Sequence, residues 1–151
     1  MAAGQTEALE KCQGVAGAGE GGPSFSRLTP AEIEALPSTG GGTGTSGLQA
    51  IRTRVLYGNP DQAGLYTIRL TIPRRVRIEA HSHPDERVAT VISGTWSFCF
   101  GNRHEENRLK ALPEGSFYTE PANELHSART GERPVVLEIT GVGPTATTYL
   151  D

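Results

Sequence analysis

The chain is short of cysteine, of surplus positive charge and of long apolar runs. Its 151 residues include two cysteines, Cys12 and Cys99, which are too few for a disulfide framework or a zinc knuckle and suit a reducing compartment. The 14 basic residues against 17 acidic ones give a net charge of −3, which argues against nucleic acid as a main partner. No apolar run approaches the ~20 residues of a membrane span, and no basic segment followed by an apolar stretch marks a secretory signal. We therefore expect a cytoplasmic protein without nucleic-acid or membrane partners.

Large apolar side chains are almost absent from residues 1–24, so this Gly-, Ala- and Glu-rich stretch cannot offset the entropy of ordering and is expected to be flexible. Thr29 as N-cap, Pro30 at the first position and Glu32 as the capping-box partner then predict a short helix over 30–36. The Gly/Ser/Thr-rich stretch 37–47 lacks a lysine in phosphate-loop spacing and is expected to be a linker. The sequence thus predicts a leader over 1–47 and one folded domain over 48–151.

From Leu48 onward the sequence consists of short β-type segments separated by Gly and Pro turns. Residues 65–72 alternate apolar and polar side chains, and residues 135–140 have strong β character. No helical period appears in this region, which favours an all-β sandwich or barrel. Trp96 and Phe98 share a strand face with Phe100, an arrangement that core packing explains more often than a pocket does.

Three of the four histidines form two compact clusters. His81 and His83 are two residues apart, so in a strand both imidazoles point to one face, and His126 follows a turn further along the chain. Converging imidazoles suit a metal ion, which predicts a site of His81, His83 and His126. Strict alternation would place Glu79 on the same face, so we expect a β-bulge before His81. His104 lies in a charged loop and is expected to be a surface residue.

These segments resemble the two motifs of the cupin superfamily in order and spacing. The first motif is carried by His81-Ser82-His83, Arg87 and Gly94, and the second by Gly115, Pro121-Ala122-Asn123 and His126. The resemblance covers roughly residues 48–150. It implies a cupin-type double-stranded β-helix, or jelly-roll barrel, usually a homodimer, that holds a divalent metal inside.

Arg87 stands where the family has a metal-binding glutamate, and a guanidinium cannot ligate a metal. Two roles stay open for it: anchoring an anionic substrate by bidentate pairing, or a structural ion pair with Glu86, Glu124 or Glu138. Glu86 would supply a carboxylate ligand if the strand began one residue out of step. Asn123 replaces the glycine of the second motif and tolerates the left-handed conformation that such turns require.

The orientation of three further residues is ambiguous. Tyr118 and Glu120 share one face of the strand before Pro121; turned inward, either could act as an acid or base, although an outward face is the commoner arrangement. Glu138, between apolar neighbours, either faces solvent or enters the barrel beside a ligand histidine. The candidate catalytic residues are Arg87, Glu86 and Tyr118.

Two classes of function fit these residues. The first is a metal-dependent enzyme acting on a small, anionic or oxygen-rich molecule; Fe(II) would support dioxygenase chemistry and is the favoured metal, whereas Mn, Ni or Zn would support Lewis-acid isomerase or lyase chemistry. The second is a non-catalytic ligand-binding barrel. Because cupins span all these reactions, the fold alone does not choose between them.

Overall fold

The computed structural model describes residues 25–150, so the predicted flexibility of residues 1–24 lies outside the described part. The chain divides into two units between Leu36 and Pro37. The described part of the first unit contains helix α2 (Pro30–Glu34). The Thr29 hydroxyl accepts from the Glu32 backbone N–H while the Glu32 carboxylate accepts from the Thr29 backbone N–H, which confirms the predicted capping box.

The second unit is built almost entirely of β-strands. Their bounds are β1 (Thr39–Gly40), β2 (Arg52–Tyr57), β3 (Gly64–Ile72), β4 (Arg77–Ser82), β5 (Arg87–Ser93), β6 (Trp96–Phe100), β7 (Lys110–Leu112), β8 (Phe117–Glu120), β9 (His126–Arg129), β10 (Val135–Gly143) and β11 (Thr148–Tyr149), with a 3-10 turn η1 (Glu106–Arg108) between β6 and β7. Among residues 25–150, no helix is long and apolar enough to cross a bilayer.

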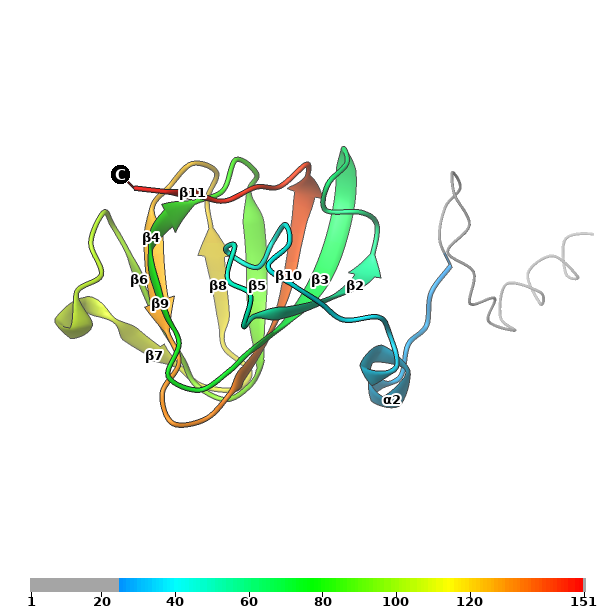
Figure 1. The fold of residues 1–151 in the computed structure, drawn as a ribbon, viewed down its shortest axis with the longest axis horizontal. Coiled ribbons are helices and arrows are strands. Elements are labelled where there is room, and N and C mark those ends of the chain that lie inside the picture. The colour runs from blue at the N-terminus through cyan, green and yellow to red at the C-terminus, as the bar shows by residue number, and fades with distance from the viewer. Residues whose placement is uncertain (1–24, 151) are drawn as a thin grey trace, which may run out of the picture. The chain divides into compact units, whose positions relative to one another are not determined.

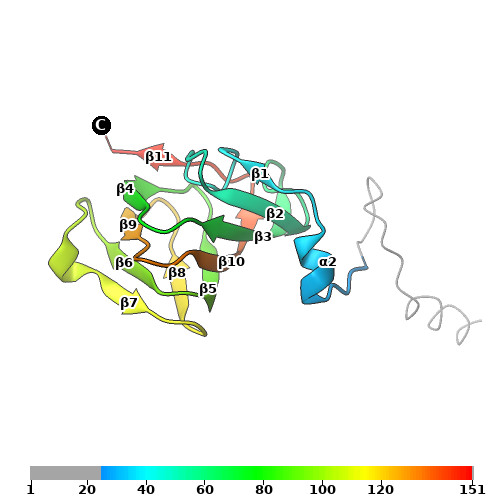
Figure 2. The same ribbon diagram turned by 60° about the horizontal axis from the view of Figure 1, so that its bottom comes forward.

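The strands form two antiparallel sheets that face one another. One sheet has the order β1-β2-β3-β10-β5-β8 and the other β11-β4-β9-β6-β7 (Figures 1 and 2). Neighbours in each sheet are often distant in sequence, as β3 and β10 are, so long-range pairing closes the unit. The predicted all-β, double-sheet jelly-roll fold is confirmed.

The core lies between the sheets, where strand alternation directs one side chain in two inward. The inward residues of β3 and β10 are apolar, and they pack against Trp96 and Phe98 of β6 from the opposite sheet. Trp96 and Phe98 are thus core residues, as expected, whereas Phe100 is 49% exposed. The alternation supplies one apolar layer shared by both sheets.

The alternation breaks in β4, where it sets the direction of the first two site histidines. Pairing between β4 and β9 shifts register between Ile78 and His81, and both Ala80 and His81 are buried. This is the predicted bulge, and it turns Glu79 outward while His81 turns into the barrel. Asn123, in the turn before β9, has φ of 63°, which confirms the left-handed conformation expected for this position.

Residues 37–47 belong to the barrel unit. Thr39 and Gly40 form β1, which pairs with β2, and Thr45 and Ser46 are buried. The linker prediction is therefore wrong for this stretch. Its composition is that of a linker, but Gly41, Gly44, Ser46 and Gly47 adopt left-handed backbone angles that fold the segment back as turns.

Candidate metal centre

Three histidines meet inside the barrel. His81 in β4 pairs directly across the sheet with His126 in β9, and His83 follows β4 one residue beyond its end. One ring nitrogen of each lies within 4.8 Å of those of the other two. The ring centroids of His81 and His126 are 4.3 Å apart, and His83 lies 5.0 and 5.2 Å from them. The geometry thus brings together the three residues that the sequence singled out.

The hydrogen bonds of these rings leave one nitrogen of each available. The Nδ1–H groups of His81 and His83 donate to the backbone carbonyls of Glu79 and Ala146, each at 2.7 Å, and His126 Nδ1 lies 3.3 Å from the Glu124 carbonyl. A carbonyl only accepts, so each proton sits on Nδ1 and each Nε2 keeps its lone pair. Within residues 25–150, the buried Nε2 atoms of His83 and His126 have no hydrogen-bond partner. Buried, neutral, unpartnered nitrogens fit a metal ion.

Burial also keeps the imidazoles neutral. It lowers the pKa of His81 to about 4, with the neighbouring His126 adding to the effect. It lowers the pKa of His83 to about 3, assisted by the positive charge of Arg87, and it lowers the pKa of His126 as well. The three rings are therefore unprotonated at neutral pH, the state in which imidazole can ligate a metal.

A carboxylate faces the same point from the opposite sheet. Glu120, the last residue of β8, places one oxygen 3.6 Å from His83 Nε2 and the other 3.7 Å from His126 Nε2. Tyr118, two residues earlier, also points inward, so the outward orientation favoured for these two residues was wrong. Strand β8 lies at the edge of its sheet, and edge position does not by itself decide which face of a strand is buried.

Arg87 holds this carboxylate in place. Arg87 in β5 and Glu120 in β8 are direct cross-strand partners, and Arg87 Nε donates to Glu120 Oε2 at 2.7 Å. Their side chains are 2% and 5% exposed. The ion pair foreseen for Arg87 therefore exists, but with Glu120 instead of Glu86, Glu124 or Glu138. Arg87 Nη1 has no partner among the described residues.

The pair stays ionised in the protein interior. Burial acts to raise the pKa of Glu120. The opposing effect of Arg87, with contributions from His126 and His83, is larger and lowers the pKa to about 2. Burial acts to lower the pKa of Arg87, and the Glu120 charge more than offsets this, so its pKa lies above the ordinary value. The chain thus carries a permanent negative charge beside the histidines, although the family's glutamate position is an arginine.

Tyr118 completes the buried polar group. Its hydroxyl is buried and makes no hydrogen bond of regular geometry with the described residues, although Glu120 and Trp96 are its neighbours. Burial, followed by the negative charge of Glu120, raises the pKa of Tyr118 well above its usual range. The phenol therefore remains protonated and able to donate a hydrogen bond at neutral pH.

Two residues that the sequence analysis missed cover the centre. Ser46 Oγ lies 3.3 Å from His81 Nε2, and the Tyr149 hydroxyl donates to the Ser46 carbonyl. The Tyr149 ring centroid is 5.4 Å from that of His81. Ser46 lies in the stretch taken for a linker, and Tyr149 lies in the short edge strand β11, so neither carried a signal of site residues.

Other candidates lie outside the centre. Glu86 is exposed, because inward Arg87 forces its neighbour outward; this does not support the ligand and catalytic roles considered for it. Glu138 pairs with Arg69 at 2.5 Å on the outer face of the sheet. The prediction for His104 was wrong: its side chain is fully buried, and its Nε2 lies 3.0 Å from a Glu106 oxygen in η1.

The sequence matches no protein-family model and no curated protein sequence. Solved structures are nevertheless similar. A polyketide cyclase, RemF from Streptomyces resistomycificus, has a TM-score of 0.62 at 15% identity over 85% of this chain and 88% of that chain. The DMSP lyase DddQ from Ruegeria pomeroyi DSS-3 has a TM-score of 0.60 at 20% identity, over 77% of this chain and 61% of that chain. An RmlC-like cupin from Shewanella frigidimarina has a TM-score of 0.56 at 16% identity, over 72% and 85%.

The chain therefore has the cupin fold, as the two motifs implied. At these identities the likeness shows the fold alone. Within that fold, the chain presents a buried three-histidine group that could hold a metal ion.

Proposed function

We propose that the chain is a metal-dependent enzyme acting on a small organic molecule, with one divalent ion held by His81, His83, His126 and Glu120. The observation that carries the proposal is the convergence of three neutral imidazoles, two of which face a buried carboxylate and have no hydrogen-bond partner for Nε2 among the described residues. Histidines buried only for packing usually have hydrogen-bond partners for both ring nitrogens, since an unsatisfied buried nitrogen costs free energy.

Each residue has a role that follows from its contacts. The backbone carbonyls orient the imidazoles, and Arg87 positions Glu120 while neutralising its charge. The Tyr118 hydroxyl, protonated and unpartnered, donates a hydrogen bond or a proton to a bound substrate. A bound metal supplies Lewis-acid or redox chemistry at open coordination positions.

For the reaction we propose first a dioxygenase-type oxidation with Fe(II). Three nitrogen donors and one carboxylate are ligands that Fe(II) accepts, and four ligands leave two of six positions open for substrate and a second small molecule. The test is oxygen consumption by the Fe(II)-loaded protein with a panel of catechols, thiols and keto acids. Oxygen uptake that depends on both iron and substrate supports this reaction.

The second candidate is a non-redox reaction with Mn, Ni or Zn. The likeness in fold to a DMSP lyase and to a polyketide cyclase favours it, because neither name denotes an oxidation. Substrate turnover seen by chromatography with no oxygen uptake supports this branch. Metal binding without turnover of any panel compound would instead favour the ligand-binding barrel.

Elemental analysis of the purified protein tests the metal centre directly. We expect a stoichiometric first-row metal, lost in His126→Ala and weakened about 10–100-fold in Glu120→Gln. Glu86→Gln is the matched control: it makes the same change on an exposed carboxylate and should leave metal content unchanged. Equal metal content in Glu120→Gln and the control would remove Glu120 from the centre.

We also propose a homodimer. The outer face of the larger sheet exposes Leu65, Val88 and Val142, and Leu65 and Val142 are cross-strand partners. Exposed apolar side chains on a sheet favour contact with another molecule. Light scattering after gel filtration should give twice the chain mass, and Val142→Asp should reduce it to one. The cytoplasmic location and the absence of nucleic-acid and membrane partners remain predictions.

A further inference from the structure

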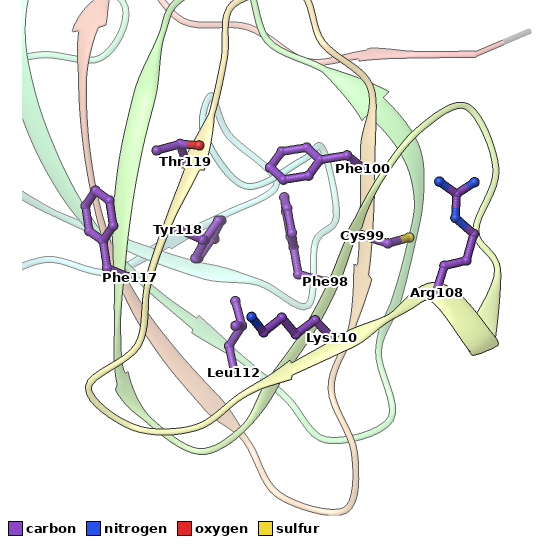
Figure 3. A pocket seen from close by; sticks show the side chains of 9 residues that line it. All are labelled: Phe98, Cys99, Phe100, Arg108, Lys110, Leu112, Phe117, Tyr118 and Thr119. Carbon is purple, nitrogen blue, oxygen red and sulfur yellow. The ribbon is translucent and has the colours of Figure 1, made fainter.

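An apolar pocket opens beside the metal centre, at the place where the two sheets are not joined. Strands β7 and β8 are the edge strands of their sheets and lie on either side of it (Figure 3). Its volume is about 510 Å³, within the range of small-molecule sites. The lining residues are Phe98, Cys99, Phe100, Arg108, Lys110, Leu112, Phe117, Tyr118 and Thr119.

Aromatic rings dominate these walls. Phe98 lies in face-edge contact with Phe100 at 5.0 Å and against Tyr118 at 4.7 Å, and the three rings lie near one another (Figure 3). Phe100 and Phe117 are 49% and 63% exposed. Large aromatic side chains left open around one hollow suit a flat apolar molecule.

The charges on the pocket are of one sign. Arg108 and Lys110 both line it, and none of its lining residues is acidic. Arg108 is weakly paired with Glu105 at 3.8 Å, and Lys110 forms no ion pair within residues 25–150. In a chain with net charge −3, this local positive charge selects an anionic group.

The pocket adjoins the three histidines through single side chains. The Phe98 ring lines the pocket and stacks on the His126 ring at 5.3 Å with 29° between their planes, so one aromatic ring borders both the pocket and the centre. Tyr118 lines the pocket and lies against Glu120. A molecule in the pocket would therefore lie one side chain away from the metal ligands.

We infer that this pocket binds the substrate, and that the substrate is a planar aromatic or similarly apolar molecule bearing an anionic group that Lys110 and Arg108 recognise. The inference rests on the proposed function insofar as it calls the bound molecule a substrate. It assigns recognition of the anionic group to Lys110 of β7 and Arg108 of η1, whereas Arg87 holds Glu120.

The experiment measures binding of 2-naphthoate by isothermal titration calorimetry, with uncharged 2-naphthamide as the matched ligand. We expect naphthoate to bind more tightly than naphthamide, and Lys110→Glu to weaken naphthoate by roughly tenfold without affecting naphthamide. Arg74→Glu, the same charge reversal at an exposed residue outside the pocket, should change neither. Phe117→Ala should weaken both ligands. Equal affinity for the two ligands, or equal effects of Lys110→Glu and Arg74→Glu, would overturn the inference.

A second measurement separates this inference from the proposed function. In protein loaded with Mn(II), proton resonances of bound naphthoate should broaden relative to protein loaded with Zn(II), because the paramagnetic ion lies close. Sharp naphthoate resonances in protein that has bound both Mn(II) and naphthoate would show that the pocket does not serve the centre. If the protein binds no metal, the proposed function fails, and the naphthoate titrations alone decide the pocket.

Discussion

Replacing Arg87 with methionine removes the positive member of the ion pair buried beside the histidines. The substitution keeps an unbranched side chain but removes the guanidinium, so the Glu120 side chain, which is 5% exposed, loses its partner. Removing one member of a buried ion pair costs about 3–5 kcal/mol, because an uncompensated charge remains in the interior. We expect a loss of this size in the free energy of unfolding of the metal-free protein, measured by urea denaturation at pH 7 with a chelator present.

Three comparisons identify the cause of that loss. Arg87→Met/Glu120→Gln carries no unpaired charge and should recover most of the stability. Saturating Zn(II) should stabilise Arg87→Met more than the wild type, because the ion supplies the missing positive charge. The deficit should also shrink in acid: without Arg87, burial raises the pKa of Glu120, so the carboxyl takes up a proton at a pH where the wild-type group, with a pKa of about 2, stays charged.

A loss below about 1 kcal/mol would place Arg87 among ordinary surface-like pairs and refute the reasoning. So would a double variant no more stable than Arg87→Met, since the effect would then come from lost packing. Equal stabilisation of the wild type and Arg87→Met by Zn(II) would mean that the ion does not sit near Glu120.

The other predictions concern the histidines and the two buried tyrosines. Metal binding at pH 7 should release no protons, because the pKa values of His81 and His83 are about 4 and about 3; calorimetry in buffers of different ionisation enthalpy measures this, and release of one proton or more would contradict it. The metal-free protein should lose stability as the pH falls from about 6.5 to about 4, since over this range the histidines bind protons in the unfolded state but not in the folded state. Urea titrations at several pH values test this, and a stability that does not change with pH would contradict it. Tyr118→Phe should change the free energy of unfolding by less than about 0.5 kcal/mol, because its hydroxyl makes no hydrogen bond of regular geometry with the described residues, yet reduce kcat by about 10²-fold or more if that hydroxyl donates to substrate. Tyr66→Phe, which removes a 2.6 Å hydrogen bond to buried Asp85, should show the reverse pattern, with a stability loss of about 1–3 kcal/mol and little change in kcat.

The parts of this fold that depend on local patterns could be predicted. Alternation located the strands, spacing united His81 with His83, and the conflict at Glu79 required the bulge that the structure contains. The capping box of α2 is likewise a purely local signal. Each of these depends on residues within a few positions of one another, where backbone geometry constrains the answer.

The parts that depend on pairing between distant strands could not. Nothing local to Glu120 says that it faces Arg87, 33 residues away, across the β5–β8 pair. The only hint was the unpaired charge that an inward Arg87 would bring into a barrel. Composition misassigned residues 37–47 for the same reason, because buried Ser46 contacts His81 and Tyr149, which lie far along the chain.

The hydrogen bond from Tyr149 to the Ser46 carbonyl has a practical consequence for work on this protein. It joins a residue near the start of the barrel unit to one near its end, and Ser46 Oγ lies 3.3 Å from His81 Nε2. A truncation chosen from sequence composition, starting at Leu48, would remove Ser46 and the hydrogen bond that it accepts from Tyr149, leaving β11 only its pairing with β4. Metal affinities should therefore be measured on a chain that keeps Ser46 and its contacts with His81 and Tyr149.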